Sequence, residues 1–338
     1  MLRAVQLTMA DSPACLTPDP GIGVGTWAWG NQLLWGYDPA QDLQLQRTFE
    51  RAIDLGLRLF DTADSYGTGR FNGRSEQLLG RFCAALSPQQ RQQLCVATKL
   101  APFPWRLGRS GLQRAFAASR GRLQGQLDRV QLHWSTARYA PWQEAPLLDG
   151  LADLVQAGEV AELGLSNVGP NRLRWLQARL AARGVTITSL QVQFSLLAPE
   201  PIGIDGVAAV CRELGIQLLA YSPLALGLLA RGADHPAAAA PLRGPRRLLF
   251  GRVGPSLGPL REAMAAIAAP HAASLAAVAL NWCRAHGAQP IPGLRTPEQA
   301  SMAAAALAWR LSDGERLELD RLALALPQWM PANPFQSA

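Results

Sequence analysis

The sequence predicts an α/β fold of the (β/α)8 TIM-barrel type, in which parallel strands are each followed by a helix. Short apolar runs alternate with amphipathic segments over nearly the whole chain, a rhythm typical of parallel strands joined by crossover helices. Eight strand-like runs are present, whereas an open sheet usually has about five or six strands. The length of 338 residues suits one large barrel. The glycines at 21, 23 and 25 have the wrong spacing for a dinucleotide-binding turn of the Rossmann fold.

The predicted strands are apolar and short, and amphipathic segments of helical length separate them. In chain order the strands span 22–26, 57–60, 95–98, 130–132, 160–165, 189–192, 217–220 and 288–291. The clearest connecting helices span 43–55, 75–86, 147–157, 172–182 and 207–214.

Two segments interrupt this rhythm. The stretch 223–259 contains four consecutive alanines at 237–240 and many Gly and Pro residues, so we expect a long mobile lid loop after the seventh strand. An amphipathic helix over 311–326 follows the eighth unit and is expected to pack on the exterior or the floor of the barrel. Neither interruption marks a second domain. We therefore expect a single domain over residues 1–338.

Composition limits the possible partners. The net charge is +7, but the arginines are spread along the chain and no nucleic-acid-binding motif accompanies them, so no nucleic-acid partner is expected. The uncharged stretch 263–283 is interrupted by Pro270, which favours two buried helices over a membrane span. The five cysteines are odd in number and form no C-x-x-C pair, so we expect reduced thiols in a cytoplasmic protein and no thiolate metal site. The oligomeric state cannot be read from these features.

Lys99 is the only lysine among 32 basic residues. Arginine stays charged at any accessible pH, whereas a lysine amine can adjust the proton affinity of a neighbouring group. Because the strand 95–98 delivers Lys99 at its carboxyl end, this residue is a candidate for chemistry. A solvated surface lysine is the alternative, since charged residues are mostly exposed.

Polar side chains follow nearly every predicted strand. In a barrel of this type the carboxyl ends of the strands meet at one mouth, where active sites lie. A purely structural role for the strand ends does not explain why a carboxylate, the single lysine, a histidine and a tyrosine occur at these positions. The strand-end residues are Asp61, Lys99, His133, Ser166, Asn167, Gln193, Tyr221, Ser222, Pro292 and Gly293.

Seven segments carry a resemblance to a known family. They are, in order, FDTADSYGTGRFNGRSEQLLG, VATKL, VQLHW, LGLSNVGPNRL, LQVQFSLL, AYSPLALGLL and PIPGLRTPEQ. Together they resemble the aldo-keto reductase family over almost the whole chain. The resemblance implies a catalytic tetrad of Asp61, Tyr66, Lys99 and His133, and NADPH bound on a barrel without a Rossmann domain.

The tetrad residues suit these implied roles. A carbonyl that receives a hydride develops negative charge on oxygen, and Tyr66 would donate the proton that neutralises it. A phenol with a pKa of about 10 needs a neighbouring cation, so Lys99 is expected to lower the pKa of Tyr66. Asp61 would keep Lys99 charged when buried. His133 would bond the substrate oxygen; a core histidine satisfied by the backbone is the alternative.

The resemblance also assigns the cofactor site. It places the nicotinamide ring on Tyr221 and its carboxamide against Ser166, Asn167 and Gln193. An arginine suits a phosphate through its planar fork, so Arg295 favours NADPH over NADH. The remaining implied cofactor-binding residues are Thr26, Trp27, Ser222, Leu224, Gly227, Leu228, Gly293 and Gln299.

Aromatic residues near the strand ends predict a flat aromatic aldehyde as substrate. The expected substrate-binding residues are Trp29, Trp35, Trp105 and Trp134, and Trp27 and Phe71 lie near the same ends. The segments GTWAWGNQLLWGYDP and HWSTARYAPWQE resemble a plant and cyanobacterial branch of the family that includes pyridoxal reductase. That resemblance implies reduction of pyridoxal to pyridoxine. The alternative is an NADPH-sensing regulatory subunit with slow turnover, a role that also occurs in the family.

Overall fold

The computed structural model describes residues 20–231 and 244–337, and within these ranges eight parallel strands form one sheet in the order β1 to β8. The eight predicted strands are all present. Their bounds are β1 Val24–Gly25, β2 Leu59–Asp61, β3 Cys95–Leu100, β4 Arg129–Leu132, β5 Glu162–Ser166, β6 Ile187–Gln193, β7 Gln217–Tyr221 and β8 Ala288–Ile291.

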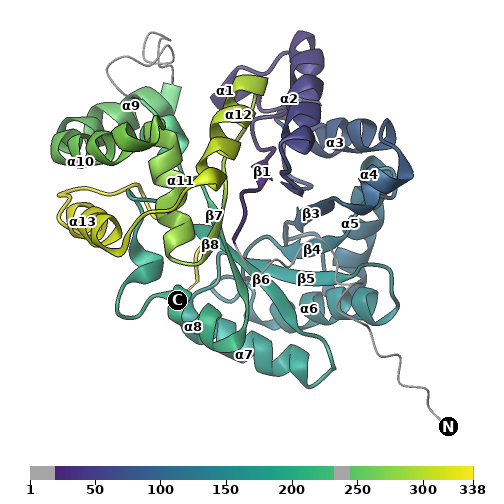
Figure 1. Cartoon of the computed structure of the whole chain (residues 1–338). Helices are drawn as coiled ribbons and strands as arrows, with labels where there is room; N and C mark the ends of the chain where they lie inside the picture. Colours follow the sequence, from purple (N-terminus) through teal and green to yellow (C-terminus); the bar gives the residue numbers. More distant parts are fainter. Residues whose placement is uncertain (1–19, 232–243, 338) are drawn as a thin grey trace.

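The first and last strands meet and close the sheet. Gly23 N donates to Pro290 O and Gly25 N donates to Pro292 O, each over 2.9 Å. The strands form the centre of the molecule and the helices surround them (Figure 1). The prediction of a (β/α)8 barrel is therefore confirmed.

The five predicted connecting helices are present as α2, α3, α6, α7 and α8. The segment of α5 is rich in arginine and glycine and shows weak amphipathic patterning, which is why the hydrophobic pattern did not reveal it. The helices are α1 Gln32–Trp35, α2 Asp42–Asp54, α3 Arg74–Ala84, α4 Pro88–Gln92, α5 Gly108–Arg122, α6 Pro141–Gln156, α7 Pro170–Ala181, α8 Val207–Leu214, α9 Gly244–Val253, α10 Gly258–Ala268, α11 Leu275–Ala285, α12 Pro297–Ala305 and α13 Asp313–Leu324.

The segment after β7 differs from the expected lid loop. Its second half is helical, since α9, a 3-10 turn at Gly254–Leu257 and the start of α10 occupy residues 244–259, so the expectation of a continuous loop over 223–259 is wrong there. Residues 232–243, including the alanines at 237–240, lie outside the described residues. The expected C-terminal helix is confirmed as α13, which packs against α10 and α11 on the outside of the barrel (Figure 1).

The uncharged stretch 263–283 forms parts of α10 and α11, which meet near Pro270 as predicted. Among the described residues no single helix is long and apolar enough to cross a membrane, and one pair passing that test together is bent by 95°. Cys83, Cys211 and Cys283 are free and buried, as expected. Cys95 is disulfide-bonded, so the expectation of reduced thiols is wrong at this residue.

The inside of the barrel holds an apolar cluster from four strands. Its members are Leu59, Cys95, Ala97, Leu219 and Ile291. Because successive side chains on a strand point to opposite faces, the residues two positions after Leu59 and Ala97 also point inward. These residues are Asp61 and Lys99, so the barrel core supports them from below.

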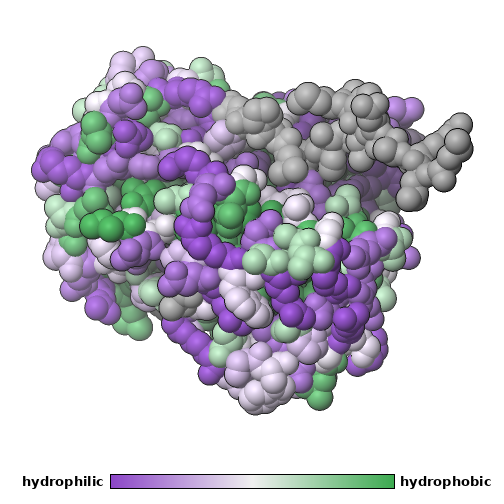
Figure 2. Space-filling view, turned by 90° about the horizontal axis from the view of Figure 1, so that it is seen from below, coloured by the Kyte–Doolittle hydropathy of each residue, from purple (hydrophilic) through white to green (hydrophobic). Residues whose placement is uncertain are grey.

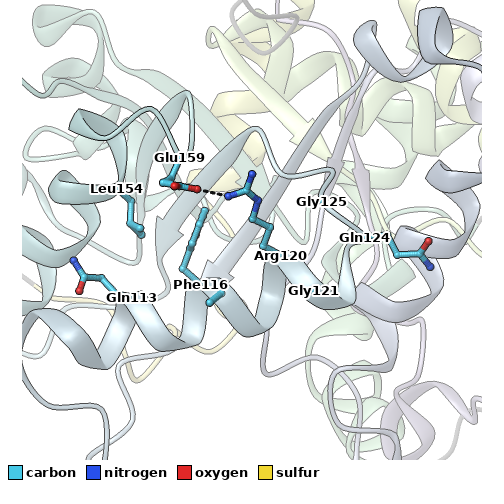
Figure 3. A pocket seen from close by; sticks show the side chains of 9 residues that line it. Gln113, Phe116, Arg120, Gly121, Gln124, Gly125, Leu154 and Glu159 are labelled. Carbon is cyan, nitrogen blue, oxygen red and sulfur yellow. Dashed lines mark hydrogen bonds and ion pairs between the residues drawn. The ribbon is translucent and has the colours of Figure 1, made fainter.

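The outer surface is mostly polar: hydrophilic residues cover most of the face seen in Figure 2, and apolar residues form small groups between them. A shallow hollow runs along α5 on this outer wall, where Arg120 forms an ion pair with Glu159 (Figure 3). None of the residues that line it belongs to the predicted site.

Candidate active site

Asp61 and Lys99 form a buried ion pair at the mouth of the barrel. Lys99 Nζ bonds to Asp61 Oδ2, and the two side chains are 1% and 4% exposed. The other carboxylate oxygen, Oδ1, accepts bonds from Gln131 Nε2 at 3.0 Å and from Gln191 Nε2 at 2.8 Å. Asp61 therefore has a donor for each oxygen, which fixes the ammonium in place.

Sequence reasoning missed Gln131 and Gln191. Each lies two residues before a predicted site residue, His133 and Gln193 respectively, and therefore points into the same barrel interior. The alternation of side chains along the predicted strands was the signal that could have found them.

Tyr66 lies on the turn after β2, where its carbonyl accepts a bond from Gly73 N at 2.8 Å. The Lys99 ammonium is 4.9 Å from the centroid of its ring. The His133 ring lies 6.0 Å from the Tyr66 ring, centroid to centroid, in an edge-on arrangement. The structure thus brings the four predicted tetrad residues together at the mouth.

The pKa of Tyr66 is raised well above its usual value, first because the phenol is buried and second because the Asp61 carboxylate opposes a phenolate. Burial and the Asp61 charge outweigh the nearby ammonium of Lys99, so the expectation that the pKa of Tyr66 is lowered is wrong for this structure. Burial also lowers the pKa of Lys99, and Asp61 opposes that shift. At neutral pH the tyrosine therefore holds its proton, as a proton donor must.

His133 is neutral at ordinary pH. Burial, followed by the positive charge of Lys99, holds the pKa of its imidazole well below the usual value. Its Nδ1 lies 3.3 Å from Ser65 Oγ, and its backbone N donates to Leu100 O over 3.0 Å. One side of the ring is held by Ser65, which leaves Nε2 for another partner.

Asn167 is the centre of a polar cluster at the ends of β5 and β7. Its backbone is in the left-handed region, with a φ of 58°. Its Nδ2 donates to His133 O at 3.0 Å and to Ser166 Oγ at 3.1 Å. Its Oδ1 accepts from the Tyr221 hydroxyl at 2.9 Å and from Asn333 Nδ2 at 3.1 Å. The structure brings these predicted residues together and adds Asn333 to them.

The C-terminal segment 331–337 reaches this cluster and was not predicted from sequence. Ser337 N donates to Asn167 O over 3.1 Å, and Gly169 N donates to Ser337 Oγ over 3.3 Å. Phe335 stacks on Trp134 with the ring centroids 4.6 Å apart. The segment lies beyond the last amphipathic helix, where no hydrophobic period indicates its path.

Arg295 lies just before α12, beside Trp35. Its guanidinium sits over the Trp35 ring, 5.1 Å from the centroid, and burial lowers its pKa. Its backbone N donates to Gln299 Oε1 at 2.8 Å. Among the described residues no carboxylate forms an ion pair with Arg295, so its side-chain donors are suited to an anionic ligand.

Aromatic rings form a wall on the side of His133. Trp134 contacts the Phe103 ring at 6.0 Å, and Phe103 stacks on Trp105 at 4.6 Å. Trp105 is 71% exposed. Phe103 and Phe335 were missed because neither directly follows a strand.

A second group of rings lies beside Tyr66. Trp27 lies 6.5 Å from the Tyr66 ring and 6.2 Å from the Trp35 ring. The predicted Trp27 and Trp35 therefore lie near the tetrad.

Two predicted residues point away from the mouth. Trp29 is fully buried, packs on Phe82 of α3 and donates from its indole to Leu294 O at 2.8 Å, so it is a core residue and the prediction of substrate contact is wrong. Thr26 is also fully buried, and its hydroxyl bonds to Asp61 O and Ser75 Oγ. The Thr26 side chain therefore holds β1 against β2 and α3 rather than a cofactor.

Four of the predicted cofactor-binding residues, Ser222, Leu224, Gly227 and Leu228, lie on the turn after β7. Ser222 has a φ of 51°, in the left-handed region. The backbone amides of Gly227 and Leu228 donate within this turn, to Leu224 O and Ala225 O at 2.8 and 3.1 Å. These two amides are thus engaged locally, which leaves side chains and other amides for a ligand.

Asp64 and Arg106 form an ion pair at the rim of the mouth. Asp64 Oδ1 also accepts from Ala101 N at 3.2 Å, and the Arg106 guanidinium lies 5.0 Å from the Phe103 ring centroid. The pair therefore fixes the loop that carries the aromatic wall. Burial raises the pKa of Asp64 to about 6, although Arg106 opposes the shift.

A (β/α)8 barrel whose mouth holds a buried lysine–carboxylate pair, a tyrosine and a neutral histidine defines a barrel oxidoreductase of the kind that reduces carbonyl groups. The family model "Aldo/keto reductase family" matches residues 21–323. The chain belongs to the aldo/keto reductase family.

Several known proteins are similar to this chain. It is 46% identical over 319 residues to "Pyridoxal reductase, chloroplastic" of Arabidopsis thaliana, which covers 94% of this chain and 86% of that protein. It is 34% identical over 284 residues to an uncharacterised oxidoreductase of Mycobacterium tuberculosis, with 80% and 79% covered. Because the Arabidopsis protein is named as chloroplastic, a cytoplasmic location for this chain stays a prediction.

Solved structures share the fold. An aldo-keto reductase of Klebsiella pneumoniae in complex with NADPH matches with a TM-score of 0.67 and 25% identity, over 95% of each chain. The glycerol dehydrogenase of Gluconobacter oxydans matches with a TM-score of 0.70 and 24% identity, over 96% of this chain and 98% of that one.

Proposed function

We propose that this protein reduces an aldehyde to an alcohol with NADPH. The observation that carries the proposal is the tetrad: Asp61 holds the Lys99 ammonium, which lies 4.9 Å from the ring centroid of a protonated Tyr66, beside a neutral His133. Reduction of a carbonyl needs a hydride at carbon and a proton at oxygen. The four side chains supply and control the proton.

The residues present fit NADPH. When bound, the cofactor supplies the hydride. The half-buried Arg295 carries donors that no described carboxylate pairs, which suits the 2'-phosphate. Asn167 and Ser166 offer amide and hydroxyl groups to the carboxamide, Gln193 lies at the end of β6 beside them, and Tyr221 offers a ring face. Ser222, Leu224, Gly227, Leu228 and Gly293 stay predicted contacts to the rest of the cofactor.

The protein side of the reaction runs from Tyr66 to the carbonyl oxygen. His133 orients that oxygen through Nε2, with the Ser65 hydroxyl donating to Nδ1. Tyr66 transfers its phenolic proton to the oxygen as the carbon is reduced, which leaves a phenolate. The fixed ammonium of Lys99 then stabilises that phenolate until solvent returns the proton.

For the substrate we propose a flat aromatic aldehyde, with pyridoxal as the specific candidate and pyridoxine as its product. The wall of Phe103, Trp105 and Trp134 offers ring faces beside His133, and such surfaces favour planar aromatic ligands. The similarity to the Arabidopsis pyridoxal reductase supports the same substrate.

The test is NADPH consumption, followed by absorbance, across pyridoxal, benzaldehydes and aliphatic aldehydes. We expect kcat/KM to be highest for pyridoxal and turnover to require Tyr66. Pyridoxal turnover no faster than that of benzaldehydes would contradict the substrate proposal. Tight NADPH binding without turnover of any aldehyde would instead favour the regulatory subunit.

Cofactor preference tests the role of Arg295. A charge-assisted bond to phosphate should make NADPH bind at least about tenfold more tightly than NADH. Arg295→Met should remove most of this difference by weakening NADPH binding, while NADH binding changes little. A preference for NADH in the wild-type protein would contradict the assignment.

A further inference from the structure

Asn333 contacts two residues that the proposed function assigns to the nicotinamide group: Asn167, for the carboxamide, and Tyr221, for the ring. Its Nδ2 donates to Asn167 Oδ1 at 3.1 Å and to the Tyr221 hydroxyl at 2.7 Å. The side chain of asparagine is itself a carboxamide, with the same donor and acceptor pair as the nicotinamide substituent. A cofactor amide and the Asn333 amide are therefore chemically equivalent ligands for this cluster.

The Asn167 side chain has no capacity left for a second amide. Its two N–H groups donate to His133 O and Ser166 Oγ. Its carbonyl oxygen accepts two bonds, one from Tyr221 and one from Asn333, and an amide oxygen has two lone pairs. A cofactor carboxamide can donate to Asn167 Oδ1 only if one of these two donors leaves.

Of the two donors, Asn333 is the one that a cofactor can displace. Tyr221 is the last residue of β7 and is fixed by the barrel. Asn333 belongs to a segment without helix or strand, between the exposed Ala332 and Pro334. Loss of its bonds need not disturb the barrel, because Ser337 independently ties the segment to Asn167 O and Gly169 N.

We propose that Asn333 is an internal competitor for the nicotinamide carboxamide, and that it sets cofactor affinity by occupying the Asn167–Tyr221 cluster until the cofactor displaces it. This inference rests on the proposed function, because it needs NADPH as the cofactor. The apparent Kd for NADPH is then the intrinsic Kd divided by the fraction of molecules in which Asn333 is released, so a small released fraction weakens binding.

The same segment extends the effect toward the substrate. Phe335 N donates to Asn333 Oδ1 over 2.9 Å, and the Phe335 ring stacks on Trp134 of the aromatic wall. Rotation of Asn333 away from Asn167 breaks or moves this turn. Occupation of the amide cluster by cofactor is thereby linked to the position of a ring at the substrate side.

The test measures Kd for NADPH by fluorescence titration, without substrate. Asn333→Ala should bind NADPH about 2- to 12-fold more tightly than wild type, the equivalent of one neutral hydrogen bond. Gln336→Ala is the matched control in the same segment, and we expect wild-type affinity. Asn333→Asp keeps the acceptor for Phe335 N and lacks the N–H donor, so it should also bind NADPH more tightly.

A cofactor fragment separates competition from general loosening. Adenosine 2',5'-bisphosphate has the phosphate end without the carboxamide, so its Kd should be the same in Asn333→Ala and wild type. If Asn333 merely supported the site, the variant would bind NADPH more weakly. Weaker or unchanged NADPH binding in Asn333→Ala overturns the inference. Wild-type protein that does not bind NADPH at all overturns the proposed function instead.

Discussion

The barrel contains two ion pairs that are equally buried and lie at opposite ends. Lys99–Asp61 has side-chain exposures of 1% and 4%, and Arg129–Glu162 has exposures of 0% and 3%. Asp61 is the last residue of β2, whereas Arg129 and Glu162 are the first residues of β4 and β5. Burial and charge are the same in both pairs, so neither property identifies the functional one.

Position and choice of cation distinguish the two pairs. The carboxyl ends of the strands form the mouth, and residues at the opposite end stabilise the barrel. At the base, Arg129 lies 2.6 Å from Glu162 Oε2, with a guanidinium that cannot lose its proton. At the mouth stands Lys99, whose pKa burial lowers. The comparison predicts that Lys99–Asp61 serves catalysis and that Arg129–Glu162 serves stability.

Lys99→Met should break the functional pair and give the largest effect. We expect kcat for aldehyde reduction to fall by about 10²- to 10⁴-fold, because the phenolate left on Tyr66 loses its cation. Folding should be affected less, since Asp61 keeps its bonds to Gln131 and Gln191. Steady-state kinetics with thermal unfolding as the control measures both. Undiminished reduction in this variant would end the assignment of Lys99 to catalysis.

Arg129→Met should show the opposite pattern. Removing one partner of a buried pair leaves an uncompensated charge and lowers the free energy of unfolding by about 3–5 kcal/mol. Turnover per folded molecule should stay at the wild-type value. Urea unfolding measures the loss, and Arg129→Met combined with Glu162→Leu should recover part of it. A variant of wild-type stability but low kcat would reverse the comparison.

Asp64→Asn tests a third ion pair, Asp64–Arg106, at the rim of the mouth. Its folded pKa is about 6 against an ordinary 3.8, so ionisation of Asp64 opposes folding by about 3 kcal/mol. In wild type this penalty is absent below about pH 4, grows as pH rises through 6 and stays constant above that range, so the free energy of unfolding declines over this interval. The variant should lack this decline. Unfolding free energies of both proteins at several pH values measure it, and parallel pH profiles would contradict it.

Ser65→Ala should give the smallest effect. The imidazole of His133 loses the partner at Nδ1 that holds its ring, which we expect to lower kcat/KM by about 2- to 12-fold. Stability should change little, because Ser65 is partly exposed. Kinetics with pyridoxal and a second aldehyde measure the loss. A decrease as large as that in Lys99→Met would show that Ser65 takes a direct part in proton transfer.

The barrel was predictable because its strands are apolar and end in polar residues. The same rule found three residues of the tetrad, since Asp61, Lys99 and His133 each follow a strand, whereas Tyr66 was assigned from the family resemblance. It failed at Trp29, because an aromatic residue near a strand end can pack outward on a helix as easily as inward. It could not reveal Asn333, whose place depends on a path through space that no local pattern encodes.

The pKa of Tyr66 also could not be predicted from the sequence. The residue types alone indicate an acid and a cation close together, which predicts a lowered phenol pKa. Whether that happens depends on how completely Asp61 cancels Lys99 and how deeply the ring is buried, and both are properties of three-dimensional packing.

The seam that closes the barrel has a further consequence. Two glycine amides of the first strand region, at Gly23 and Gly25, donate to the carbonyls of Pro290 and Pro292. Proline has no N–H, so neither acceptor residue can return a bond across the seam. Deuterium uptake at the amides of these two glycines therefore measures how often the barrel opens between β1 and β8.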